Sequence, residues 1–254
     1  MRIVILGTGN LATQLGMALH AQHAEIIQVY GRTSTSASDL ANLLGCTFTT
    51  SKPEIITDAD IYILAVSEAA IAEVLTDAPI RDRLIVHTSG SISIDILAAF
   101  SKNYGVFYPL QTLSKQKEVD FRTVPICIEA NSTENLGKLN ILAKTISDQV
   151  FLIDSAQRME LHLAAVFVCN FVNHFYSIGE KLLQEQHLDF NLLKPLIAET
   201  AQKAMLFSPH DVQTGPAVRD NQKIMELHRK MLEQHPAWQK LYELISNDII
   251  STHP

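Results

Sequence analysis

Residues 2–12 read RIVILGTGNLA, and this stretch decides the fold. The apolar run before Gly7 predicts a buried strand, and the pattern GxGxxA in residues 7–12 opens a helical pattern that continues to residue 20. A strand, a glycine turn and a helix in this order are typical of a dinucleotide-binding unit, in which the pyrophosphate meets the free N–H groups of the helix N-terminus. The residues expected to cradle the phosphates are Gly7, Thr8, Gly9, Asn10 and Leu11.

The next strand pattern, residues 25–30, runs into Gly31, Arg32, Thr33 and Ser34. An NAD site usually has Asp or Glu at about this distance from the glycines, to bind the ribose hydroxyls, and this segment has no acid. A guanidinium with two neighbouring hydroxyls suits the 2′-phosphate of NADP instead. We therefore predict NADP as the cofactor, bound by these four residues. The alternative is that the arginine is a solvated surface residue.

Apolar runs and helical patterns alternate through the first half of the chain, which predicts an α/β domain with a doubly wound, parallel, Rossmann-type sheet. The predicted strands cover residues 2–6, 25–30, 61–66, 84–87, 106–108, 125–129 and 150–153. The predicted helices between them cover residues 10–20, 36–44, 68–75, 93–101 and 132–147.

From residue 154 on, only helical patterns recur. They cover residues 156–186, 191–208, 220–234 and 237–250. We therefore expect a cofactor domain over residues 1–153 and an all-α domain over residues 154–254.

The composition limits the class of protein. Hydrophobic residues make up 47% of the 254 residues and charged residues 19%, which indicates a globular protein rather than a disordered chain. The net charge of −7 has no basic block to offset it, so we expect neither a nucleic-acid groove nor a membrane surface as partner. Three scattered cysteines and no predicted signal or membrane-spanning segment favour the cytoplasm.

Polar side chains follow several of the predicted strands. In an open parallel sheet, ligands bind beyond the carboxyl ends of the strands, so these side chains would suit a nicotinamide ribose and a small polar substrate. We assign Val66, Ser67 and Ser89 to the cofactor. We assign Ser91, Tyr108 and Gln111 to the substrate. The alternative for each hydroxyl is ordinary turn and helix-cap chemistry.

Residues 158–181 are mostly apolar on all sides, which predicts a central, buried helix. At 100° per residue, its polar side chains fall within roughly a quarter to a third of the circumference. They are His162, Cys169, Asn170, Asn173 and Ser177. Such a stripe either meets polar groups of other helices or faces a pocket. On the second interpretation, we predict that Asn173 binds the substrate.

The loop at residues 213–220 contains another candidate, Arg219. It either binds a carboxylate of the substrate or forms a surface ion pair with Asp220.

Together these motifs resemble the two-domain oxidoreductases that join a Rossmann-like domain to a helical domain called DUF2520. That family belongs to the wider group of 6-phosphogluconate dehydrogenase-like reductases, with ketopantoate and pyrroline-5-carboxylate reductases. The resemblance covers nearly the full chain and rests on residues 7–10, 31–33, 87–90, 108–112 and 213–220, with His162, Ala164, Ala165 and Asn170. It implies NADP binding, a substrate cleft between the domains and a homodimer formed by the helical domain. Relatives commonly carry His where this chain has Tyr108.

The resemblance also bears on the catalytic residues. Some branches of the group use a Lys four residues before an Asn on the first interdomain helix. If Asn170 is that Asn, Val166 occupies the position of the Lys, and His162 is the available acid. We therefore assign the catalytic role to His162 and Asn170, in an NADP(H)-dependent oxidoreductase that reduces a small C=O or C=N substrate.

Other classes of function are weighed against this one. The missing Lys favours a catalytically silent, NADP(H)-binding sensor or interaction protein. A methyltransferase is a weaker alternative, because Arg32 lies where the ribose of its cofactor would want an acid. We expect no metal site and no serine hydrolase, since neither HExxH nor GxSxG occurs in the sequence.

Overall fold

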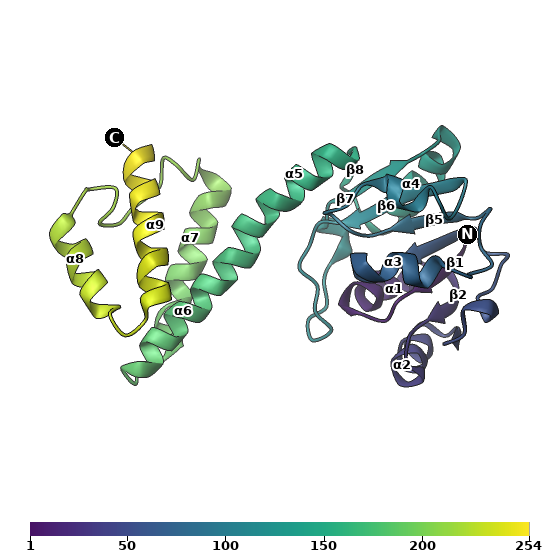
Figure 1. Ribbon diagram of the computed structural model, residues 1–254, viewed down its shortest axis with the longest axis horizontal. Helices are drawn as coiled ribbons and strands as arrows, with labels where there is room; N and C mark the ends of the chain where they lie inside the picture. Colours follow the sequence, from purple (N-terminus) through teal and green to yellow (C-terminus); the bar gives the residue numbers. More distant parts are fainter. Residues whose placement is uncertain (254) are drawn as a thin grey trace. The chain divides into compact units, whose positions relative to one another are not determined.

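The computed structural model describes residues 1–253, and the chain forms two compact units, Met1–Cys169 and Asn170–Pro254. The first unit contains one eight-stranded sheet in the order β3-β2-β1-β4-β5-β6-β7-β8 (Figure 1). Its strands are β1 (Arg2–Leu6), β2 (Glu25–Tyr30), β3 (Thr47–Thr49), β4 (Ile61–Leu64), β5 (Leu84–His87), β6 (Asn103–Pro109), β7 (Ile126–Ala130) and β8 (Val150–Leu152). The order reverses between β1 and β4, which confirms the Rossmann-type fold and places the glycine turn at the switch point.

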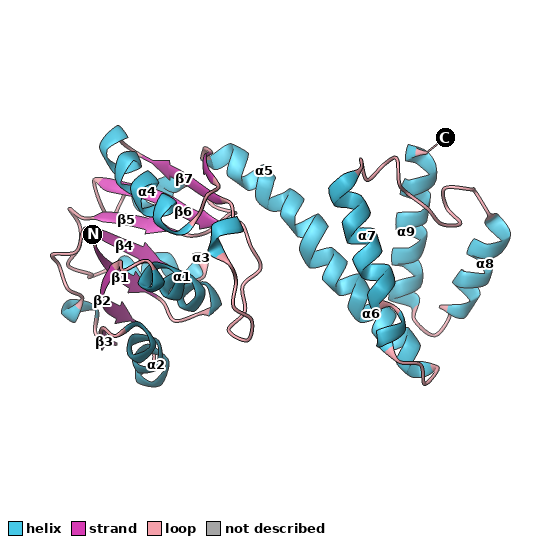
Figure 2. Ribbon diagram, turned by 180° about the vertical axis from the view of Figure 1, so that it is seen from behind, coloured by secondary structure: helices cyan, strands magenta, loops and turns pink. Residues whose placement is uncertain are grey.

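Helices cover both faces of the sheet (Figure 2). On one face pack α1 (Asn10–Ala21), α2 (Ser34–Leu44) and α4 (Thr133–Ile146), and on the other packs α3 (Glu68–Leu75). Alternate residues of β1 therefore enter two different cores: Ile3 and Ile5 join the first, and Val4 and Leu6 join the second. This double burial is why the strand reads as an unbroken apolar run in the sequence.

Three details differ from the sequence prediction. Strand β3 was not predicted, because its three residues are too few to show a pattern. Strand β7 runs antiparallel to β6, since the segment between them has only a short 3₁₀ turn, Phe121–Thr123, and a parallel connection would need a full crossover. The helix predicted over 93–101 is a 3₁₀ turn, Ile94–Leu97.

The predicted helix after residue 154 is one continuous helix over Ser155–Glu185. It consists of α5 (Ser155–Ala165), a π-helical segment (Val166–Phe171) and α6 (Val172–Glu185). The π-helical turn is wider than an α-turn, so the stripe calculated at 100° per residue does not continue in phase from α5 into α6. By length and composition alone, with a mean hydropathy of 1.3, this helix could cross a membrane.

The burial predicted for this helix is not found within the chain. Only Arg158 is buried in α5, and no residue is buried in α6. An apolar helix pattern indicates that a face will be covered, but it does not indicate that the same chain covers it. The boundary between the two compact units falls inside this helix, whereas the last strand ends at Leu152.

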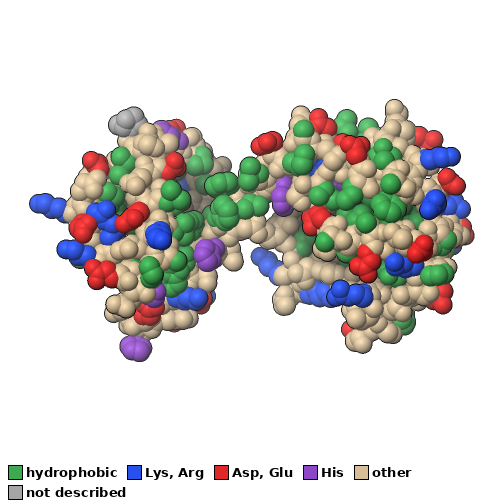
Figure 3. All heavy atoms as spheres, in the orientation of Figure 1, with side chains coloured by type: hydrophobic (Ala, Val, Ile, Leu, Met, Phe, Trp, Pro, Cys, Tyr) green, Lys and Arg blue, Asp and Glu red, His purple; other side chains and the backbone are tan. Residues whose placement is uncertain are grey.

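The second unit is helical and has little core of its own. After α6 it contains α7 (Lys194–Leu206), α8 (Gln222–Met231) and α9 (Pro236–Thr252). Its buried residues among those described are Ala217, Met225, Leu232 and Ser246. All three clusters of buried apolar side chains lie in the first unit. Hydrophobic side chains are accordingly visible on the surface of the helical unit (Figure 3).

Candidate functional site

The glycine turn between β1 and α1 is shaped to admit an anion. Gly7 has a φ of +128°, and a Cβ on it would lie 2.2 Å from the carbonyl oxygen of Ala65, so only glycine fits. Gly9 is the N-cap of α1, and a Cβ there would meet nothing within 4 Å, so its approach side is open. The first turn of α1 has no side-chain cap and no acid. Its N–H groups are therefore available to a phosphate.

A second open helix N-terminus follows β2. Helix α2 begins at Ser34, and its N-cap Thr33 makes no side-chain cap, because the Thr33 hydroxyl lies 2.6 Å from the hydroxyl of Ser36. No acid occurs in the first turn of α2. Arg32 and Thr33 are exposed beside these free N–H groups. A cation, hydroxyl groups and a free helix N-terminus together suit the binding of the extra phosphate of NADP. Ser36, which also accepts from the Thr8 hydroxyl at 3.2 Å, was missed by the sequence analysis.

A cavity of about 310 Å³ joins the glycine turn to Arg32. Its volume lies in the range of small-molecule sites, and its walls combine apolar side chains with a few polar groups. Seven residues predicted for the cofactor line it: Gly7, Thr8, Gly9, Gly31, Arg32, Val66 and Ser67. The remaining lining residues, which were not predicted, are Tyr30, Ala65, Ala70, Glu73 and Val74. The open cradle at Gly9 and the guanidinium at the same cavity fit NADP.

The other residues predicted for the cofactor lie outside the lining of this cavity. They are Asn10, Leu11, Thr33, Ser34 and Ser89. The first four belong to the two helix starts just described. Ser89 lies after β5, in a loop held by hydrogen bonds to Glu68 at the start of α3.

Glu68 holds this loop through two serines. The hydroxyls of Ser89 and Ser91 donate to Oε1 of Glu68 over 2.7 Å and 3.1 Å. The bond from Ser89 is the main reason why the pKa of Glu68 lies below its ordinary value. Both serines predicted to bind ligands therefore already have a protein partner, and they fix Gly90 between them.

Tyr108 and His162 meet directly over Gly90. The Tyr108 hydroxyl, at the end of β6, lies 3.1 Å from Nδ1 of His162 on α5, and the two rings meet edge to face with centroids 6.2 Å apart. A Cβ on Gly90 would lie 2.7 Å from Nδ1 of His162 and 2.8 Å from Cζ of Tyr108. Burial raises the pKa of Tyr108, whereas His162 is half-buried. The structure thus brings together a residue predicted for catalysis and one predicted for substrate binding.

Helix α5 is fixed to the sheet four residues before His162. Arg158 is fully buried, pairs with Glu129 of β7, and donates to the carbonyl oxygen of Ile92 over 2.6 Å. Residues four apart lie on one face of a helix, so the anchor at Arg158 also sets the position of His162. Neither Arg158 nor Glu129 was predicted, although an arginine within an apolar helical pattern was a usable signal.

A buried histidine contacts the loop that contains Ser89 and Gly90. His87 ends β5 with no exposed surface, and its Nδ1 accepts from the N–H of Ser89 over 3.2 Å. Burial, aided by the charge of Arg158, lowers its pKa to about 4. It is therefore uncharged at neutral pH.

The remaining predicted residues are placed elsewhere. Gln111 lines a separate cavity of about 340 Å³, and its Oε1 accepts from the N–H of Thr112. Asn170, Asn173 and Arg219 belong to the second unit, where all three are exposed, and Asn170 lies in the π-helical segment. Within residues 1–253, no group of three or more His, Cys, Asp or Glu residues is placed to hold a metal ion.

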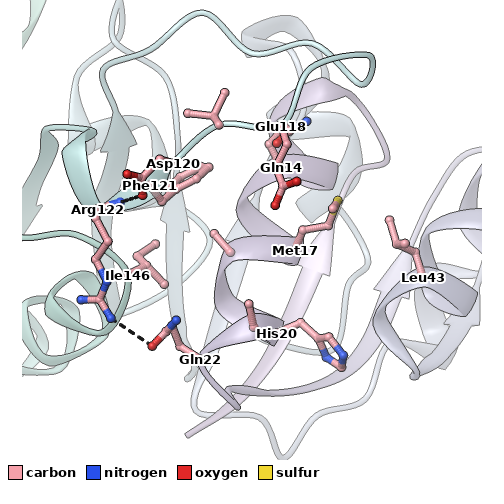
Figure 4. A pocket seen from close by; sticks show the side chains of 13 residues that line it. Gln14, Met17, His20, Gln22, Leu43, Glu118, Asp120, Phe121, Arg122 and Ile146 are labelled. Carbon is pink, nitrogen blue, oxygen red and sulfur yellow. Dashed lines mark hydrogen bonds between the residues drawn. The ribbon is translucent and has the colours of Figure 1, made fainter.

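A larger cavity, of about 660 Å³, lies between α1 and the segment around Asp120 (Figure 4). Arg122 closes one side of it by donating to Oε1 of Gln22 over 3.0 Å. No motif in the sequence predicts this cavity. None of its lining residues belongs to the glycine turn or to the Tyr108–His162 pair.

Two family models match the chain. Residues 2–98 match the family described as NADP oxidoreductase, coenzyme F420-dependent. Residues 124–249 match the domain of unknown function DUF2520. Both agree with the resemblance inferred from the motifs, and no protein in the curated set matches.

Solved structures agree with these models. A candidate NADP oxidoreductase from Bacteroides fragilis is 44% identical over 98% of each chain, with a TM-score of 0.94. A 1-pyrroline-5-carboxylate reductase from Streptococcus pyogenes is 18% identical over 99% of this chain and 98% of that one, with a TM-score of 0.66. A reductive aminase from Aspergillus terreus, in complex with NADPH and ethyl-5-oxohexanoate, is 14% identical over 100% and 96%, with a TM-score of 0.74. The last two support the fold alone, and the broader 6-phosphogluconate dehydrogenase-like grouping fits only loosely.

Proposed function

Because this chain belongs to the NADP oxidoreductases in which an oxidoreductase domain precedes a DUF2520 domain, we propose that it reduces a small carbonyl or imine compound with NADPH. The observation that carries the proposal is the cavity that joins the glycine turn to Arg32. The glycine turn holds the pyrophosphate, and Arg32, Thr33 and Ser34 hold the 2′-phosphate.

When bound, the reduced nicotinamide supplies the hydride for such a reduction. The protein must then bind the substrate, orient it and give it a proton. His162 donates that proton, because it is a half-buried imidazole at the carboxyl edge of the sheet and its Nε2 has no hydrogen bond within residues 1–253. Tyr108, whose hydroxyl lies 3.1 Å from Nδ1 of His162, orients this proton donor toward the substrate.

The test is NADPH oxidation, followed at 340 nm, with a panel of a 2-oxo acid, an aldehyde and a cyclic imine. At least one compound should be reduced, and His162→Ala should slow that reaction about 100-fold or more. His20→Ala is the control, since His20 is exposed on α1, away from the Tyr108–His162 pair. An unchanged rate in His162→Ala removes this residue from the proton-transfer role.

A second candidate is an NADPH-binding sensor without turnover. Val166 supports it: if Asn170 is the Asn of the Lys-dependent branches of the group, Val166 occupies the position of the Lys, and its side chain cannot donate a proton. The sensor would bind NADPH tightly, oxidise it with no compound of the panel, and change its oligomeric state when the cofactor binds.

We also propose a homodimer formed by the helical unit, in the cytoplasm. The helices of this unit expose large apolar side chains, including Leu192 at 65%, Met205 at 77% and Leu206 at 75%. Many exposed large apolar side chains on one unit favour an interface in a protein that remains in solution. A second copy of the chain offers the same surface, so one symmetric contact would cover both. The three free cysteines suit a reducing compartment.

A further inference from the structure

The pair of Tyr108 and His162 determines where the protons of both side chains lie. Within residues 1–253, the Tyr108 hydroxyl has one hydrogen-bond partner, Nδ1 of His162 at 3.1 Å. Tyr108 is only 9% exposed, and burial raises its pKa, so the phenol keeps its proton at neutral pH. A buried O–H group needs an acceptor. The Tyr108 hydroxyl therefore donates to Nδ1, and the neutral ring of His162 carries its own proton on Nε2.

The surroundings hold this arrangement in place. Gly90 leaves room for both rings, and any larger residue there would collide with them. Arg158 fixes α5 to the sheet one turn before His162, and Tyr108 belongs to β6, which is paired with β5 and β7. Because both side chains belong to rigid elements, they lose little further conformational entropy when a proton is transferred between them.

We propose that Tyr108 is a positioning residue that fixes the tautomer of His162 and passes its own proton to that ring during reduction. The inference rests on the proposed function, in which His162 gives a proton to the substrate. A neutral imidazole is a weak acid, because loss of the Nε2 proton alone would leave an anionic ring. Tyr108 removes this obstacle by protonating Nδ1 in the same step.

Two protons move together through the imidazole of His162 during reduction. The Nε2–H bond of His162 breaks as an O–H or N–H bond forms on the substrate that has received a hydride from NADPH. The O–H bond of Tyr108 breaks as the Nδ1–H bond forms, so the imidazole stays neutral throughout. Before the next turnover, Nε2 takes a proton from water while the Nδ1 proton returns to the Tyr108 phenolate, which restores the phenol and the starting tautomer and leaves hydroxide in the solvent.

The charged groups around the pair are compatible with a transient phenolate. Arg158 of α5 favours the phenolate and acts to lower the pKa of Tyr108, against the larger effect of burial and a smaller one from Cys127 of β7. Glu68 of α3 interacts electrostatically with His162 and is partly screened by solvent. His87 of β5 has a pKa of about 4 and carries no charge at neutral pH.

The tautomer is tested on the full-length protein labelled with ¹⁵N-histidine, without any substrate. Nitrogen NMR at pH 8 should show His162 with an unprotonated Nδ1 and a protonated Nε2, assigned by the signals missing in His162→Ala. Tyr108→Phe should convert this into a mixture of tautomers. Tyr104→Phe, a phenol on the same strand with no hydrogen bond from its hydroxyl within residues 1–253, should leave it unchanged. A proton on Nδ1 in the wild-type protein would overturn the proposal.

The relay is tested by the pH profile of NADPH oxidation with the best compound of the panel. At pH 8, Tyr108→Phe should be about 100-fold slower than the wild type, with the affinity for NADPH changed less than about twofold. Its rate should rise relative to that of the wild type as the pH is lowered, because a protonated ring can give its Nε2 proton without a second donor. A Tyr108→Phe profile parallel to that of the wild type would rule the relay out. If the wild type reduces no compound, the proposed function fails, while the NMR result still decides whether Tyr108 fixes the tautomer.

Discussion

Arg158 and Glu129 form an ion pair that is nearly closed to solvent, with side chains 1% and 17% exposed. The pair joins α5 to β7, and Ser155 donates to the same Glu129 oxygen over 2.8 Å. Removing one member of such a pair leaves the other charge poorly solvated, which costs more than the pair contributes when intact.

We expect Arg158→Met to lower the free energy of unfolding by about 3–5 kcal/mol. Arg122→Met is the matched control, because Arg122 pairs with Asp148 at the surface over 3.5 Å. Loss of this surface ion pair should lower the free energy of unfolding by less than about 1 kcal/mol. Urea unfolding followed by circular dichroism measures both, and equal losses would contradict the role of Arg158 as the anchor of α5.

Arg32 should discriminate between the two nicotinamide cofactors. Arg32→Ala should weaken NADPH binding by about 10- to 100-fold, which corresponds to one charge-assisted contact with a phosphate, and should leave NADH binding nearly unchanged. Fluorescence titration of both cofactors gives the two affinities, with Arg81→Ala as a surface control. A wild-type protein that binds NADH and NADPH equally would refute the role of this guanidinium.

A substitution at Gly9 should weaken cofactor binding without affecting the stability of the fold. A methyl group at Gly9 meets no protein atom within 4 Å, so Gly9→Ala should fold normally while its methyl group obstructs the pyrophosphate. We expect NADPH affinity to fall at least tenfold, with no loss of thermal stability beyond about 1 kcal/mol. Gly137→Ala, also in open space but on α4, should bind NADPH like the wild type. Loss of binding in both variants would point to an indirect effect.

His87 should make the protein less stable in mild acid. Its pKa is about 4 in the folded protein against 6.5 ordinarily, so the unfolded chain takes up a proton first as the pH falls. Stability that is fully present above pH 6.5 should therefore decline between pH 6.5 and 4, by about 3 kcal/mol from this residue. His87→Asn should flatten that part of the curve of unfolding free energy against pH. The exposed control His20→Asn should not, and a wild-type-like slope in His87→Asn would refute the assignment.

The apolar surface of the helical unit should be an interface between two copies. Leu206→Asp places a charge on that surface and should shift the protein from dimer to monomer in sedimentation at micromolar concentration. Leu43→Asp, an equally drastic change at an exposed leucine of α2, should leave the dimer intact. A wild-type monomer, or wild-type protein that partitions into lipid vesicles through its long apolar helix, would refute the dimer.

The first unit could largely be predicted because its signals are local. Strand β1 and the turn at Gly7 follow from an apolar run and a backbone that only glycine adopts, and both are confirmed. The start of α2 beside Arg32 was equally readable, although the predicted helix began at residue 36 rather than Ser34. Such features depend on a few neighbouring residues, so a single sequence contains them.

The remainder depends on contacts that are distant in sequence. Nothing near His162 reveals that Tyr108, 54 residues earlier, would meet its ring, or that Gly90 would leave the space for both. The π-helical segment at Val166–Phe171 is equally hidden, because a wide turn has no composition of its own. The apolar pattern of residues 158–181 predicted a buried helix, but among the described residues only Arg158 of α5 and none of α6 is buried, because such a pattern does not depend on what packs against it.

The uneven distribution of core residues has a consequence for how the chain matures. A nascent polypeptide that has left the ribosome as far as residue 169 already contains all three apolar clusters and can fold at once. In the proposed homodimer, the helices made afterwards would be covered only when a second copy binds. Formation of that dimer would be a second-order event, faster where many copies are translated together.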